Sequence, residues 1–120
     1  MSLQLSERAI GDVVVIDLSG KITLGDGGDA MLKDKVRSLL QQGHKKLILN
    51  LGEVSYIDSA GLGELVQAYA ASGKNGGSLK LLNTTKRIKD LLSITKLLTV
   101  FETFESEAEA VTSFSAVQGA

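Results

Sequence analysis

The sequence contains no cysteine, no proline and no tryptophan, and it has only one histidine among its 120 residues. The absence of cysteine excludes disulfide bonds, thiolate zinc sites and cysteine nucleophiles, and it favours a cytoplasmic location. A single histidine without cysteine cannot build a usual zinc site, and we interpret His44 as a solvated turn residue rather than a catalytic base. We therefore expect no catalytic residue, no metal ion and no cofactor.

An excess of charge of one sign and long apolar segments are also missing. Lys and Arg total 13 against 14 Asp and Glu, a formal net charge of −1, which leaves no basic surface suited to nucleic acid or an anionic membrane. Apolar runs such as 47–49 are far short of the roughly 20 residues that cross a bilayer. We expect one compact globular domain, with neither nucleic acid nor membrane as a partner.

Strands and helices alternate along most of the chain. Leu3 and Leu5 alternate with polar neighbours, the turn Gly11-Asp12 follows, and the β-branched run 13–18 predicts the second strand of a hairpin. Further strands are expected at 47–51, 79–82 and 100–104. Four helices are also expected, and in each one the apolar residues recur at helical spacing and should face the core. The four sets are Leu32, Val36, Leu39, Leu40; Leu62, Leu65, Val66, Tyr69; Ile88, Leu91, Leu92; Val111, Phe114.

Caps and turns give the expected limits of these elements. Gly43 closes the first helix, and the glycine-containing stretch 73–77 closes the second. Asn83 or Thr84 is expected to cap the third helix, and Ser106 the fourth, with capping-box spacing. Gly25 to Gly28 are expected to be loop, and residues 115–120 a disordered tail. The fold class is α/β: one domain over 3–114, a mixed sheet of about five strands with about four helices, in the order β-β-α-β-α-β-α-β-α. In such sheets partners favour the carboxyl ends of strands, here the loops after Leu18 and Leu51.

The segment 57–63 places two glycines in the first turns of a predicted helix. There Gly61 and Gly63 each cost roughly 0.5–1 kcal/mol relative to alanine, and with Ala60 they leave a helix start almost bare of side chains. Another backbone or a protein surface could come close to it. Ser59 stands at this helix start, and two interpretations remain open: Asp58 or Ser59 is only an N-cap, or the Ser59 hydroxyl accepts a phosphoryl group that changes surface charge.

Residues 57–63 (Ile-Asp-Ser-Ala-Gly-Leu-Gly), following the apolar strand 47–51, resemble the signature of STAS domains, and most closely that of bacterial anti-sigma factor antagonists. Gly20-Lys21-Ile22 after the second strand and the order of elements agree with this resemblance, which runs over about residues 3–114. It implies a non-enzymatic partner-switching protein that binds an anti-sigma factor serine kinase and frees the sigma factor. It also implies that the kinase phosphorylates Ser59, which ends binding, and that a metal-dependent serine phosphatase reverses this.

The surface expected to bind the kinase spans 22–28 and 58–63. Its residues are Ile22, Thr23, Asp26, Asp58, Ser59, Ala60, Gly61, Leu62 and Gly63. Two other functions remain open: a STAS module that scaffolds a signalling assembly or regulates a transporter without being phosphorylated, and a domain that binds a small ligand or nucleotide through the glycine-rich loop 25–28. That loop matches neither the Walker A nor the dinucleotide fingerprint.

Overall fold

The computed structural model describes residues 3–118, and the side chains of residues 3–115. Five strands form one mixed sheet in the order β1-β2-β3-β4-β5: β1 (Gln4–Ile10), β2 (Val13–Ile22), β3 (Lys46–Ile57), β4 (Ser78–Leu82) and β5 (Thr103–Phe104). β1 and β2 form the expected antiparallel hairpin, and the other neighbours pair in parallel. Because parallel neighbours need a crossover, helices separate these strands along the chain.

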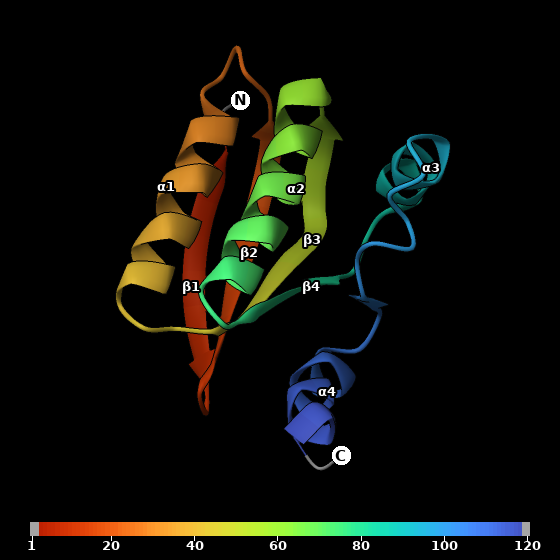
Figure 1. Cartoon of the computed structure of the whole chain (residues 1–120). Coiled ribbons are helices and arrows are strands. Elements are labelled where there is room, and N and C mark those ends of the chain that lie inside the picture. The colour runs from red at the N-terminus through yellow and green to blue at the C-terminus, as the bar shows by residue number, and fades with distance from the viewer. Residues whose placement is uncertain (1–2, 119–120) are drawn as a thin grey trace.

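Four helices complete the predicted α/β fold: α1 (Gly28–Gln41), α2 (Ser59–Lys74), α3 (Lys86–Ile94) and α4 (Glu107–Gln118). α1 and α2 lie side by side across one face of the sheet (Figure 1). Their apolar sides and α3 share one core with the inward residues of the strands, among them Ile16, Leu49 and Leu81. α4 covers part of the opposite face, where Ala110 and Phe114 join a second apolar cluster.

The residues that were expected to face the core from the helices differ in burial and form three groups. Buried are Leu32, Val36, Leu39, Leu62, Leu65, Ile88, Leu92 and Phe114. Leu40, Val66, Leu91 and Val111 are partly buried, and Tyr69 is exposed although its ring lies edge-on against Phe101. Gly43 closes α1 with a φ of 93°, a left-handed conformation that glycine adopts without strain.

Two strands run further than their apolar patterns predict. β2 continues to Ile22 instead of ending at Leu18, and β3 continues to Ile57 instead of Leu51. Register shifts between β2 and β3 let the pair extend past the end of β4. In this extension fewer positions are buried, so the apolar run that marks a central strand is lost. The loops that the sequence analysis expects to face a partner therefore begin at residues 23 and 58.

Several limits of elements also differ from expectation. The N-cap of α3 is Thr85, not Asn83 or Thr84, because Asn83 has a left-handed φ of 57° and holds a turn while Thr85 accepts a hydrogen bond from Ile88 N. β5 is only two residues long, since the buried Phe101 packs on Tyr69 instead of pairing with β4.

Two segments expected to be irregular, the end of the glycine-rich loop and the C-terminal tail, are partly helical instead. Gly28 belongs to α1 and not to the loop, because Gly27 takes the capping position. α4 continues through Gln118, so residues 115–118 of the expected disordered tail are helical; no glycine or proline interrupts 107–118. Residues 119–120 of that tail lie outside the described residues.

Candidate functional site

The candidate site lies where β2 and β3 end and α2 begins. Asp58 is the N-cap of α2, and its extended backbone (φ −101°) turns the chain from β3 into the helix. Its carboxylate accepts two backbone hydrogen bonds, from Gly61 N at 2.9 Å and from Leu24 N at 3.1 Å. The first of these satisfies a helix-start donor, and the second ties the β2–α1 loop to the start of α2. One side chain thus fixes both halves of the site.

These hydrogen bonds set the charge of the helix start. Donation from Gly61 N, and then from Leu24 N, holds the pKa of the Asp58 carboxyl below its usual value. Asp58 is therefore an anion at neutral pH, directly beside Ser59. A phosphoryl group on Ser59 would add a second negative charge next to this carboxylate, at a helix end whose dipole favours anions.

Ser59 is the first residue of α2, and its side chain is exposed. One helical turn later, on the same face, lies Gly63, which is exposed and has no atom within 4 Å of the position that a Cβ would occupy. Ala60, which follows Ser59 in the sequence, is half-buried. The surface beside the hydroxyl is thus low and open, as the glycine pattern predicts, and an approaching protein can reach Ser59.

Gly61 serves a different purpose from Gly63. A Cβ at Gly61 would lie 2.1 Å from the carbonyl oxygen of Ile22, so the glycine admits the protein's own β2 backbone and not a partner. Gly61 and the next residue, Leu62, are buried, and Leu62 packs in the core. The helix start with few side chains that was expected from the sequence is therefore only partly on the surface. Gly61 is packed against β2, and of the two glycines only Gly63 borders open space.

The loop 23–27 is held by its own hydrogen bonds. Thr23 Oγ1 donates to Asp26 Oδ2 at 3.1 Å, and the backbone N–H groups of Gly27 and Gly28 donate to the carbonyl oxygens of Leu24 and Thr23. A phosphate-binding loop instead presents such N–H groups to its ligand. Gly28 packs directly on β2, where a Cβ would lie 2.5 Å from the carbonyl oxygen of Lys21. These contacts do not favour the nucleotide-binding alternative.

Leu24 lies within the predicted surface segment 22–28 but is not among the residues named for it from the sequence. Its side chain is 69% exposed while its backbone N–H is fixed by Asp58, so an apolar group stands in water on a held loop. The signal was a leucine within a loop of glycine and aspartate, where no core position is expected. Exposed apolar side chains of this kind serve as anchors when a partner covers them. Tyr56, also exposed, lies under the Arg87 guanidinium, 5.8 Å from the ring centroid.

The predicted site residues thus fall into two groups. Exposed or half-buried are Asp26, Asp58, Ser59, Ala60 and Gly63; buried are Ile22, Thr23, Gly61 and Leu62. The fold brings both segments to one end of the sheet, since Asp58 N donates to Ile22 O as well. The buried group shapes this end and the exposed group forms its surface.

Residues 3–118 contain no cluster of three or more histidine or acidic side chains placed to hold a metal ion. Over the same residues, no helix combines the length and apolar character needed to span a bilayer.

Comparison with known proteins defines the class of this domain. The sequence model of the STAS domain matches residues 4–110, which is most of the chain. The chain therefore belongs to the STAS domain family, and within it to the anti-sigma factor antagonists, which are non-enzymatic regulators.

Individual relatives support this placement. The chain is 31% identical over 102 residues to the anti-sigma-B factor antagonist of Bacillus subtilis, covering 85% of this chain and 91% of that protein. It is 23% identical over 122 residues to the anti-sigma F factor antagonist of Paenibacillus polymyxa, covering 98% and 99%.

Solved structures share the fold. An anti-sigma factor antagonist from Mycobacterium paratuberculosis superposes with a TM-score of 0.80 at 20% identity, covering 93% of each chain. The Bacillus antagonist SpoIIAA in its phosphorylated form gives a TM-score of 0.73 at 20% identity, covering 92% of this chain and 99% of that one. At these identities the likeness establishes the fold alone.

Proposed function

We propose that this protein is a cytoplasmic anti-sigma factor antagonist that phosphorylation of Ser59 switches off. Its partner is an anti-sigma factor that is also a serine kinase, and binding of that partner frees the sigma factor. A serine phosphatase restores the unmodified protein. The observation that carries the proposal is the exposed Ser59 at the start of α2, beside the ionised Asp58 and the open surface at Gly63.

The physical basis of the switch is charge at a docking surface. A phosphoryl group adds roughly −1.5 to −2 charges at neutral pH and three bulky oxygens to a surface that is low and nearly flat. The Asp58 carboxylate already accepts two backbone hydrogen bonds, so it cannot move away without freeing those donors. A bound partner would meet both the added volume and the two adjacent anions, and the complex dissociates.

Phosphorylation is tested with the purified full chain, the cognate anti-sigma factor kinase and ATP, with the phosphate mapped by mass spectrometry. We expect modification at Ser59, and none in Ser59→Ala. Ser93 on α3 and Ser6 on β1 are also exposed and serve as internal controls for unselective transfer. Phosphate on one of these in place of Ser59 would refute the site.

Partner release is tested by measuring affinity for the same kinase. We expect Ser59→Asp to weaken binding at least tenfold, and Ser59→Asn, which has the same shape without the charge, to weaken it less. Gln67→Glu adds a charge on the exposed side of α2 away from Ser59 and should leave affinity unchanged. An equal loss for Gln67→Glu would show that the effect is general electrostatics and not a switch at Ser59, and an equal loss for Ser59→Asn would show that the charge is not its cause.

A second candidate function is a scaffold module that works without phosphorylation. Three apolar side chains at the end of α3 and in the segment after it favour it: Ile94 (79% exposed), Leu98 and Val100. Such side chains mark a contact surface when a partner covers them. Association that is abolished by Ile94→Ser but unaffected by Ser59→Asp would identify this function in place of the switch.

A further inference from the structure

Lys80 is buried at a position where the sheet needs an apolar residue. It lies in β4 opposite Ile48 and is 1% exposed, on the face that α4 covers with Ala110 and Phe114. A buried ammonium loses its hydration, and an apolar side chain of similar volume at such a site is often neutral or stabilising. Residues that break such local rules are found most often at functional sites.

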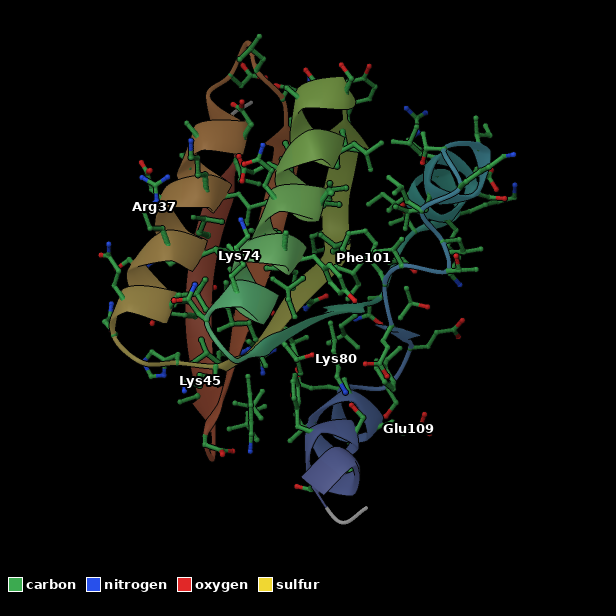
Figure 2. The ribbon with its side chains drawn as sticks, viewed as in Figure 1. Arg37, Lys45, Lys74, Lys80, Phe101 and Glu109 are labelled. Atoms are coloured by element: carbon green, nitrogen blue, oxygen red, sulfur yellow. The ribbon has the colours of Figure 1, made fainter. Side chains whose placement is uncertain are left out.

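The contacts of Lys80 keep its charge inside this face. Its ammonium donates to Ser113 Oγ of α4 at 2.5 Å, lies 3.4 Å from Glu102 Oε1, and stands 4.3 Å from the ring centroid of Phe114. Figure 2 shows the side chain pointing from β4 toward α4. Glu102 is mostly exposed, so its carboxylate only partly neutralises the ammonium.

A cavity of about 350 Å³ opens beside this lysine. Its wall is made of Lys80, the Phe114 ring and Glu102, together with Lys45, Lys46 and the turn and strand start at 76–78. That turn comes close because Gly77 has no side chain: a Cβ there would lie 2.4 Å from the carbonyl oxygen of Lys45. The cavity lies at the amino ends of β3 and β4, whereas Ser59 follows the carboxyl end of β3, in a molecule 41 Å long.

The charges around this cavity are mainly positive. Lys46 pairs with Asp12 at 2.6 Å and Lys80 with Glu102, whereas no ion pair among residues 3–118 involves Lys45. The wall therefore offers an ammonium with no carboxylate partner at the rim, a buried ammonium inside, and an apolar surface made of the Phe114 ring and the lysine stems. A volume near 350 Å³ is at the small end of ligand sites.

We propose that this cavity binds a small organic carboxylate with an apolar tail. The carboxylate would pair with the exposed ammonium of Lys45 and would be attracted by the buried ammonium of Lys80 behind the wall, and the tail would pack on Phe114. Because these residues lie at the far end of the sheet from Ser59, the site is independent of the phosphorylation switch and stands or fails separately from it. It would give the domain a small-molecule input in addition to its protein partner.

The test is an NMR titration of the full chain with 4-phenylbutyrate, followed by backbone amide shifts. We expect saturable shifts at residues 76–78 and 102, with a Kd on the order of 1 mM, as is usual for a ligand of this size. The neutral amide of the same acid and inorganic phosphate are the matched controls. The amide lacks the charge and phosphate lacks the tail, so both should bind at least tenfold more weakly.

Variants locate the binding. Lys80→Met keeps the length and apolar stem and should weaken binding about tenfold, and the exposed Lys45→Gln should weaken it as well. Lys33→Met, on α1, is the control and should leave affinity unchanged. A urea unfolding curve checks that Lys80→Met is folded, and Lys45→Gln gives the answer if it is not.

Four results would overturn the proposal. They are the absence of saturable shifts at 10-fold above the expected Kd, equal binding of the neutral amide, equal binding of phosphate, and shifts centred on residues 94–100. The first denies a site, the second and third deny the ligand class, and the fourth places binding on the apolar side chains after α3.

Discussion

Asp58 and Leu24 are 34 positions apart in the sequence, yet the Asp58 carboxylate accepts a hydrogen bond from the Leu24 backbone N–H at 3.1 Å. The same carboxylate caps α2 through Gly61 N. The exposed Leu24 and the helix start at Ser59 are therefore held together by a single side chain. Changes at Asp58 should be felt in both segments.

Asp58→Asn separates these two tasks. An asparagine oxygen can still accept from Gly61 N, as asparagine is a good N-cap, but its NH₂ group would then face the Leu24 N–H, donor against donor. We expect faster amide hydrogen exchange at Leu24 with little change at residues 61–62. Unchanged exchange at Leu24 would show that the hydrogen bond does not hold the loop.

Leu24→Ser tests the exposed leucine as a partner anchor. Removing a side chain that is 69% exposed should leave the urea midpoint nearly unchanged. It should weaken binding to the proposed anti-sigma factor kinase about tenfold, since an apolar anchor at an interface centre contributes about 1–2 kcal/mol. Ile94→Ser, at 79% exposure, is the matched control and should bind normally. A loss of affinity in the Ile94 variant alone would move the interface to the end of α3.

Gly61→Ala and Gly63→Ala should differ although the two glycines are two residues apart. The added methyl at Gly61 would lie 2.1 Å from Ile22 O, so we expect the free energy of unfolding to fall by about 1–3 kcal/mol. At Gly63 there is open space, and alanine should raise stability by roughly 0.5–1 kcal/mol. Chemical denaturation of both variants measures this, and similar values for the two would contradict the packing described.

Arg8 holds two carboxylates from different elements and makes stability depend on acid pH. It contacts Asp17 Oδ2 and Glu107 Oε1, both at 2.6 Å, and lowers the pKa of each carboxyl. Carboxyls with a depressed folded pKa stabilise above their unfolded pKa, near 4, and this stabilisation is lost as pH falls through the folded pKa. Arg8→Met should therefore cost about 1 kcal/mol or less at pH 7, and this cost should disappear as the pH falls through the folded pKa of the two carboxyls.

Glu64 should make stability depend on pH in the opposite direction from the Arg8 pairs. It is half-buried between α1 and α2, and burial raises the pKa of its carboxyl above the usual value, although Lys33 and Arg37 act against this. A raised folded pKa means that stability is highest at low pH and falls as pH rises through the unfolded and then the folded pKa. Glu64→Gln should be more stable than the wild type at pH 7, by less than about 1 kcal/mol, with the difference vanishing near pH 3. A difference that grows toward low pH would contradict the burial.

The order of elements could be predicted because core positions leave periodic apolar patterns. The run 47–51 and the stripe Leu62, Leu65 mark a strand and a helix by their own spacing. The extended ends of β2 and β3 could not be predicted in this way, because Lys21 and Tyr56 pair in a two-stranded extension with exposed positions. Pairing there depends on backbone hydrogen bonds and on register shifts, which leave little trace in side-chain type.

The sequence predicted where the candidate site lies, but only partly which role each of its residues has. The glycines at 61 and 63 indicated close approach, but a sequence cannot show which surface approaches: Gly61 faces β2 and Gly63 faces solvent. The tether from Asp58 to Leu24 was beyond reach as well, since it depends on a contact between distant segments. Only tertiary packing decides such pairs.

The strands lie in the sheet in the order of the chain, so β1 forms one edge and β5 the other. Gln4 pairs with Ser19 near the end of the sheet that carries Ser59, whereas α4 runs to the opposite end (Figure 1). An affinity handle or fluorescent reporter fused after α4 would consequently stay clear of a protein that docks at Ser59. The same fusion placed ahead of β1 would crowd the surface around Ser59, and binding assays on a solid support should immobilise the domain through its C-terminal side.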